Sequence, residues 1–313
     1  MSSADQPSES RRSTTLIKTA LTVAFVAAGA VYITQRLAEF RALAWPSVTS
    51  VIVVALGFLA SVFFRSLYNY FVTRQLGTTI SLRESFMLSA VVTASNSLLP
   101  ANPGATFRAV YMKKVHSFPY GYFASSTALS FVITTLMMSL IGMTLLIMID
   151  QQLGYFRLDL FVALPVIAIL MTAGLLLRKS SHAEREDSVW TSFQSSYFEL
   201  TRKRSLVYLC VLIVCSNYLF AAIVWFIVLG EYAFDITLLE GFLFAASQIV
   251  SGLINLTPGA AGFQELVGIY IGRSFQLTAV ELFAILVWVR LVRVLAAVLL
   301  GIPCAIALHN RSR

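Results

Sequence analysis

The chain has 313 residues, of which 58% are hydrophobic and only 12% are charged, and its mean hydropathy is +0.79. This composition leaves too little polar surface to cover a water-soluble globule, and it predicts a polytopic helical membrane protein. The formal net charge of +8 does not indicate nucleic-acid binding, because the Lys and Arg residues lie mostly in short polar segments between apolar runs. Lys and Arg residues in such segments indicate on which side of the membrane each segment lies.

Residues 1–15 are polar and Ser-rich, and they predict a disordered cytoplasmic N-terminus. A single integral membrane domain is then expected over residues 16–308, with about six full spans of about 20 residues or more. The predicted spans cover residues 16–34, 48–72, 120–149, 158–177, 206–229 and 278–308.

The one long polar loop covers residues 178–205. Its centre predicts an amphipathic helix at the membrane surface, with Trp190, Phe193, Tyr197 and Phe198 on the lipid side. The loop is too short to be a catalytic domain. The cysteines Cys210, Cys215 and Cys304 lie in apolar runs without a CxxC motif, and we interpret them as small buried hydrophobic residues.

Between the spans, two apolar stretches are interrupted. The first runs from Ser85 to Val115 and breaks around Asn96, Pro100 and Gly104, before Arg108. Each side of the break has only about 10–15 residues, which is too short for a span of about 20 residues. The pattern predicts a re-entrant hairpin that enters and leaves the membrane on the same side.

The second interrupted stretch runs from Gly241 to Arg273 and contains a similar set of residues, namely Asn255, Pro258, Gly259, Gly262 and Glu265. Pro removes a backbone donor and Gly permits unusual dihedral angles, so both favour a break. A helix is expected to restart after Gly104 and Gly262, with a positive dipole end that suits a phosphate. Asn96 and Asn255 are expected to hydrogen-bond the loosened backbone.

Positive charge is distributed asymmetrically when the N-terminus is placed in the cytoplasm and each hairpin returns to its own side. Of the 23 Lys and Arg residues, only Arg36, Arg41, Arg157 and Arg273 fall outside, and Arg65, Arg108, Arg290 and Arg293 lie at membrane depth. This bias predicts cytoplasmic N- and C-termini. Hairpin one must then enter from the cytoplasm and hairpin two from outside.

The fold class predicted is therefore all-α, with two re-entrant broken-helix hairpins in inverted repeats. Half one covers about residues 48–149 and half two about residues 206–308, linked by the span 158–177 and the loop 178–205. Transporters of this kind place their site where the broken helices meet near the midplane. Upstream of the breaks, polar residues share one helix face in each hairpin and suggest either a wet lining or interhelical hydrogen bonds; they are Ser89, Thr93 and Ser97, and Ser247, Ser251 and Asn255.

Arg108 and Glu265 are costly at this depth, at about 2.5–3.5 kcal/mol each even on the lenient insertion scale. One interpretation is an ion pair between them that clamps the hairpins together. The other is that Arg108 holds a lipid phosphate through its planar donor fork while Glu265 engages a polar headgroup or exchanges a proton. Arg290 and Arg293 share a helix face, so they are either headgroup contacts or a partner for Glu265. Arg65 lies near the end of its span and is expected to snorkel.

Together these motifs resemble the flippase-like family of the transmembrane region of bacterial lysylphosphatidylglycerol synthase and its stand-alone relatives. The likeness extends over about residues 16–308 and is carried by Asn96, Pro100, Gly104, Arg108, Pro258, Gly259, Gly262, Glu265 and Arg290. Two places differ: relatives often have an acidic residue where this chain has Ala105, and Gly-Arg where it has Ala101-Asn102. Both differences bear on which substrate is bound.

The resemblance implies an inner-membrane protein that moves a charged or glycosylated lipid between leaflets. Membrane lipids with an anionic or lipid-linked headgroup are the expected partners, with a lipid-modifying or glycosyltransferase enzyme as a further candidate. A small-solute secondary transporter and an accessory subunit of a lipid-modifying enzyme remain alternatives. We expect no enzyme activity, no metal site and no cofactor, and no lysyl transfer because the sequence ends at Arg313 without an aminoacyl-transfer domain.

Overall fold

A computed structural model describes residues 27, 29–43, 45–99, 103–153, 166, 189–233, 235–253, 262–275 and 277–311. Every regular element in these ranges is a helix, and none of the described residues lies in a strand. The all-α prediction is confirmed for this part of the chain. A short helix, α2 (Leu37–Ala42), precedes the first long one.

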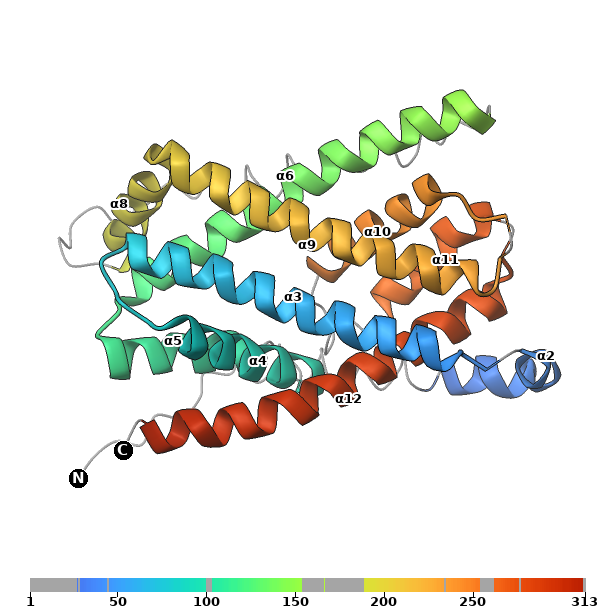
Figure 1. Cartoon of the computed structure of the whole chain (residues 1–313), viewed down its shortest axis with the longest axis horizontal. Helices are drawn as coiled ribbons and strands as arrows, with labels where there is room; N and C mark the ends of the chain where they lie inside the picture. The colour runs from blue at the N-terminus through green and yellow to red at the C-terminus, as the bar shows by residue number, and fades with distance from the viewer. Residues whose placement is uncertain are drawn as a thin grey trace.

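Four long helices dominate the structure (Figure 1): α3 (Val48–Gln75), α6 (Tyr120–Leu153), α9 (Arg204–Gly230) and α12 (Ala279–Arg311). Each is long and apolar enough to cross a membrane. They coincide with the spans predicted at 48–72, 120–149, 206–229 and 278–308. The predicted spans 16–34 and 158–177 lie mostly outside the described residues.

The outer surface of α12 shows what surrounds the molecule. Leu291, Leu295, Leu299, Ile302 and Ile306 are all exposed, and they recur every three or four residues along the helix. This spacing places them on one face. A continuous exposed apolar stripe of this length is not stable in water, whereas lipid chains cover it at no cost. The helix is therefore arranged for a bilayer.

Two helical hairpins lie between the long helices. The first consists of α4 (Leu82–Leu98) and α5 (Pro103–His116), and the second of α10 (Leu238–Leu253) and α11 (Phe263–Gly272), followed by the turn η2 (Arg273–Phe275). Figure 1 shows hairpin one toward one end of the long axis and hairpin two toward the other end.

The hairpin of each half packs against a long helix of the other half. Hairpin helix α4 packs against α12 of the other half, and hairpin helix α10 packs against α6 of the first half. The first helices of the halves, α3 and α9, also pack on each other, and the backbone N–H of Ser47 at the start of α3 donates to Glu231 just after α9 (2.6 Å). Hence α3 and α9 run antiparallel, and the halves have opposite direction.

Small residues allow α4 and α12 to approach closely. A side chain at Gly301 would collide with Ala94, and Ala90 and Ala297 are buried in the same contact. Pairs of small residues four positions apart on both helices let backbones come together, which is how helices associate in lipid. Hairpin one is thereby held on a helix of half two.

The polar loop predicted at 178–205 contains α8 (Val189–Arg202). This helix docks on α6: Ser196 donates to the hydroxyl of Ser125 (2.8 Å), and a side chain at Gly121 would collide with Ser192. Of the predicted lipid-facing aromatics that the structure describes, Phe198 is exposed and Phe193 is half-buried. Tyr197 is also half-buried and packs against the hydrophobic cluster that joins α3, α4, α5 and α9, so protein covers part of its side chain. Packing against protein competes with lipid for this face.

Candidate functional site

The closed tip of hairpin one is held by a side chain that bridges the break. Asn96, near the end of α4, accepts a hydrogen bond from the backbone N–H of Gly104 at the start of α5 (2.9 Å). The first N–H groups of a helix have no partner within the helix, so this bond satisfies one of them. The predicted role of Asn96 is confirmed. Pro100 lies outside the described residues.

Gly104 fits where no other residue does. A Cβ at this position would collide with the backbone carbonyl oxygen of Val92 and with the side-chain oxygen of Asn96. Because the nearest atoms belong to the backbone of α4, they cannot rotate away. The close approach of α4 and α5 at the tip therefore requires glycine.

Replacing Gly104 with Ala should destabilise the protein by about 1–3 kcal/mol, the usual cost of overpacking a close contact. The matched control is Gly230→Ala, because a Cβ there would make only an ordinary contact with Ile236 at 3.6 Å. Thermal melting of the detergent-purified variants measures the difference. Equal melting temperatures for both variants would show that the hairpin tip is not packed as described.

Arg108 lies on α5, one helical turn beyond Gly104. Its guanidinium carbon is 5.3 Å from the centroid of the Phe123 ring on α6, and it interacts electrostatically with Arg65 and Tyr68 of α3. Within the described part of the chain, no carboxylate lies within ion-pairing distance of Arg108. The cation is thus placed near an aromatic face and a second cation, and none of the described carboxylates compensates it.

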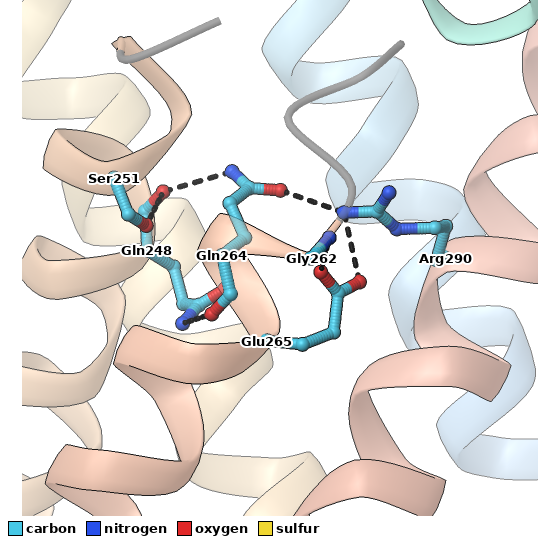
Figure 2. Close-up of polar contacts among 6 residues, drawn as sticks. All are labelled: Gln248, Ser251, Gly262, Gln264, Glu265 and Arg290. Carbon is cyan, nitrogen blue, oxygen red and sulfur yellow. Dashed lines mark hydrogen bonds and ion pairs between the residues drawn. The ribbon is translucent and has the colours of Figure 1, made fainter. Parts of the chain in front are cut away.

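Hairpin two carries a polar network, shown in Figure 2. One carboxylate oxygen of Glu265 pairs with Arg290 of α12 (2.8 Å), and the other accepts the backbone N–H of Gly262 (2.6 Å). Gly262 has φ of +85°, a left-handed conformation that favours glycine, at the start of α11. Glu265 therefore caps α11 and ties the hairpin to α12 at the same time.

These contacts decide between the predicted partners of Glu265. Its ion pair is with Arg290, so the interpretation in which Arg108 and Glu265 clamp the hairpins together is wrong. The sequence leaves this open because both arginines lie on helices other than the one that carries Glu265, and only tertiary packing selects one of them. Arg293, one turn further on α12, instead lies 5.5 Å from the ring centroid of Trp225.

Two glutamines that the sequence analysis missed connect α10 and α11, the two helices of hairpin two. The side chain of Gln248 donates to the backbone oxygen of Gln264 (3.2 Å), and that of Gln264 donates to the backbone oxygen of Gln248 (3.1 Å). Gln264 also accepts a hydrogen bond from Arg290 (3.2 Å). In Figure 2 the network runs from Ser251 through both glutamines to Arg290.

Glycines make room for these glutamines. A Cβ at Gly252 would collide with the amide of Gln264, and a Cβ at Gly268 would collide with the amide of Gln248. Each glycine lies four residues after a glutamine on its own helix, so the pattern Gln-x3-Gly occurs in both α10 and α11. This repeated spacing is the sequence signal that could have identified the pair.

The polar ladders predicted upstream of the breaks are mostly satisfied within their own helices. Thr93 and Ser97 donate to backbone carbonyls one turn earlier, and so do Ser247 and Ser251. Ser89 is the exception, because it accepts a hydrogen bond from Asn69 of α3 (3.1 Å). These hydroxyl groups are therefore compatible with an apolar environment, and among the described members of the ladders interhelical bonding is seen for Ser89.

The structure thus brings the predicted site residues together in two groups. Asn96 and Gly104 meet at the tip of hairpin one next to the turn that carries Arg108, and Gly262, Glu265 and Arg290 meet at hairpin two. Asn255, Pro258 and Gly259 lie outside the described residues. Among the described residues there is no group of three or more His, Cys, Asp and Glu side chains that could hold a metal ion.

Comparison with curated proteins and with solved structures finds no match. A family model described as "Lysylphosphatidylglycerol synthase TM region" matches residues 15–301, which include both hairpins and the long helices α3, α6 and α9. The chain therefore belongs to the family of the lysylphosphatidylglycerol synthase transmembrane region.

Proposed function

We propose that this protein moves a lipid with a charged or glycosylated, phosphate-containing headgroup between the leaflets of the inner membrane. Family membership makes it a multi-pass membrane protein related to lipid modification or transport. In the proposal the chain itself catalyses no reaction, and an enzyme that modifies the lipid is its partner. The observation that carries the proposal is the environment of Arg108.

Arg108 differs from Arg290 in how its charge is compensated. Arg290 has Glu265 at 2.8 Å, whereas no described carboxylate pairs with Arg108. An arginine at membrane depth is costly unless an anion or water compensates it, and such residues mark substrate pathways. A phosphate fits the planar guanidinium fork through two parallel hydrogen bonds. A lipid phosphate would therefore supply the missing charge.

The surroundings of Arg108 support a lipid over a small solute. Arg65, which interacts with Arg108 electrostatically, is accessible at its side chain, and Phe107 next to Arg108 is exposed. In the proposal, the exposed Phe107 side chain meets lipid chains. A headgroup near Arg108 can therefore keep its acyl chains in the membrane while its phosphate contacts the guanidinium.

The two hairpins supply the geometry for alternating access in this proposal. We place hairpin one as entering from the cytoplasm and hairpin two from outside, with cytoplasmic N- and C-termini. The basic residues Lys113 and Lys114 lie in the last turn of α5, at the open end of hairpin one, in agreement with the excess of positive charge on cytoplasmic segments. Broken helices from opposite sides that meet at mid-depth are a recurrent design of transporters.

Cysteine labelling tests this topology. After replacement of Cys210, Cys215 and Cys304, single cysteines at Lys113 and at Arg273, both exposed positions, are placed at the open ends of the two hairpins. An impermeant maleimide should label Lys113→Cys only from the cytoplasmic side and Arg273→Cys only from the outside. Labelling of both from one side would contradict the inverted arrangement.

Transport itself is tested in vesicles that contain the purified protein and a fluorescent lipid in one leaflet. An anionic phospholipid should equilibrate between leaflets faster than in protein-free vesicles, while a lipid without a phosphate should not. Release of an entrapped small anion without lipid exchange would favour the small-solute transporter. Absence of both activities would leave the accessory-subunit hypothesis and overturn the proposal.

A further inference from the structure

Two arginines of half one lie at a similar depth on neighbouring helices. Arg65 lies on α3, ten residues before that helix ends at Gln75, and Arg108 lies on α5, eight residues before that helix ends at His116. At about 1.5 Å per residue, the arginines are about 15 and 12 Å from these helix ends. The last turns of α3 and α5 pack in one core cluster, so the two ends lie together. Both cations are therefore at nearly the same level.

One turn of α6 links the surroundings of the two arginines. The centroid of its Phe123 ring lies 5.3 Å from the guanidinium carbon of Arg108. Three residues later, the backbone oxygen of Ser126 accepts a hydrogen bond from the hydroxyl of Tyr68 (3.0 Å). Tyr68 lies three residues after Arg65 on α3, so these two side chains are neighbours on the helix surface. The helices α3, α5 and α6 thus converge at this level, and the charges of the two arginines interact.

The positive charge of this group is not compensated within the described part of the chain. No described carboxylate lies within ion-pairing distance of Arg65 or Arg108. Tyr68 adds no negative charge, because its hydroxyl still carries the proton that it donates to Ser126. Two like charges at membrane depth are unfavourable together, and an anion between them would relieve both costs.

The double charge indicates which kind of phosphate suits the group. A phosphate diester, such as the linkage in phosphatidylglycerol, carries one negative charge. A phosphate monoester carries about −1.5 to −2 at pH 7 and presents three acceptor oxygens. One guanidinium fork engages two of these oxygens, which leaves an acceptor for a second arginine. A monoester can therefore compensate both cations at once, whereas a diester compensates only one.

Apolar side chains beside the arginines favour a lipid over free phosphate as the source of this group. Phe107, next to Arg108, is exposed, and Phe64, next to Arg65, is half-buried. Acyl chains attached to the phosphate can cover such apolar surface and gain free energy from it. Inorganic phosphate has no acyl chains and gains nothing from these neighbours.

We propose that Arg65 is a second phosphate-binding residue beside Arg108, and that the pair selects lipids with a phosphate monoester headgroup over lipids with a phosphate diester. Arg108 contacts the phosphate of either class, and Arg65 discriminates between them. For its consequence in transport this rests on the proposed function, because it names the class of lipid that the site at Arg108 takes.

The first test measures binding without transport, through the rise in melting temperature that a ligand of the folded protein causes. At about pH 8, short-chain phosphatidic acid should stabilise the detergent-purified full chain at about tenfold lower concentration than phosphatidylglycerol with the same acyl chains. Arg65→Gln should reduce this preference to about twofold or less. Arg65→Lys retains the second charge and should keep most of it.

Two controls accompany this test. Arg74→Gln is the matched variant, because Arg74 lies on the same helix but is exposed in its last turn, and it should keep the wild-type preference. An equal loss of preference in Arg74→Gln would show a general effect of positive charge and overturn the role of Arg65. Inorganic phosphate at the same concentrations should leave the melting temperature unchanged. Stabilisation by phosphate as strong as that by phosphatidic acid would overturn the assignment to a lipid.

The second test measures competition in vesicles. Unlabelled phosphatidic acid should inhibit leaflet exchange of fluorescent phosphatidylglycerol at about tenfold lower concentration than unlabelled phosphatidylglycerol does, and Arg65→Gln should remove the difference between the two competitors. Should Arg65→Gln fail to accumulate, Arg65→Met, which keeps an unbranched apolar stem, gives the same comparison.

The outcomes separate this proposal from the proposed function. A wild type that binds both lipids equally, or an unchanged preference in Arg65→Gln, overturns the selection by Arg65 and leaves lipid transport standing. A binding preference that depends on Arg65 supports the two-arginine site even if no vesicle shows exchange, in which case only the lipid-transport proposal is lost.

Discussion

Arg108→Gln should reduce leaflet exchange of an anionic lipid by roughly 10- to 150-fold, since a hydrogen bond to a charged group contributes about 1.5–3 kcal/mol. The melting temperature should stay the same or rise, because no described carboxylate loses its partner when the guanidinium is removed. Removal of an uncompensated cation from membrane depth also relieves a desolvation cost. Loss of transport with a stable fold is the expected signature of a substrate contact.

The Arg108→Lys variant distinguishes charge from geometry. Lysine keeps the positive charge but presents a point charge instead of a planar fork, so it should recover only part of the exchange. Arg83→Gln is the control for a general effect of lost positive charge, because Arg83 is exposed in the first turn of α4. Full exchange in Arg108→Gln, or a melting temperature that falls well below that of Arg83→Gln, would argue against a phosphate site at Arg108.

The sequence predicts the fold wherever the evidence is local. Breaks at Asn96 to Gly104 and around Gly262, and the lengths of the apolar runs, correctly predict the helix pairs α4–α5 and α10–α11 and the four long helices of the described residues. Spacing also predicts the bond from Asn96 to the backbone after the break, because its partner lies only eight residues away. Local spacing fixes such contacts before any tertiary packing is known.

Local spacing in the sequence does not predict contacts between side chains on helices that are far apart along the chain. Nothing in the spacing distinguishes Arg108 from Arg290 as the partner of Glu265, and the choice depends on α11 packing against α12. The docking of α8 on α6 was missed for a related reason: an amphipathic pattern shows that one face is covered without showing by what. The small residues Gly121 and Ser192 were a signal of protein contact that the aromatic residues obscured.

The largest loss of stability is expected at Glu265. Glu265→Leu removes the partner of Arg290 and the cap of Gly262 together, and it leaves the Arg290 guanidinium half-buried beside Gln264 without its carboxylate. Breaking a buried ion pair from one side costs about 3–5 kcal/mol. Glu281→Leu is the matched control, because Glu281 caps α12 in the same way but has no described arginine partner, and its loss should cost only about 1 kcal/mol.

The charge swap Glu265→Arg with Arg290→Glu tests the double role of Glu265. If the pair were a simple ion pair, the swap would restore most of the stability. Glu265 also accepts the N–H of Gly262 at 2.6 Å, and an arginine at this position has only donors, so the cap stays broken. We therefore expect the swap to melt well below the wild type, while Glu265→Gln with Arg290→Gln, which retains an acceptor for Gly262, melts above the swap. A swap that melts at the wild-type temperature would show that Glu265 contributes only its charge and that the start of α11 is held by other contacts.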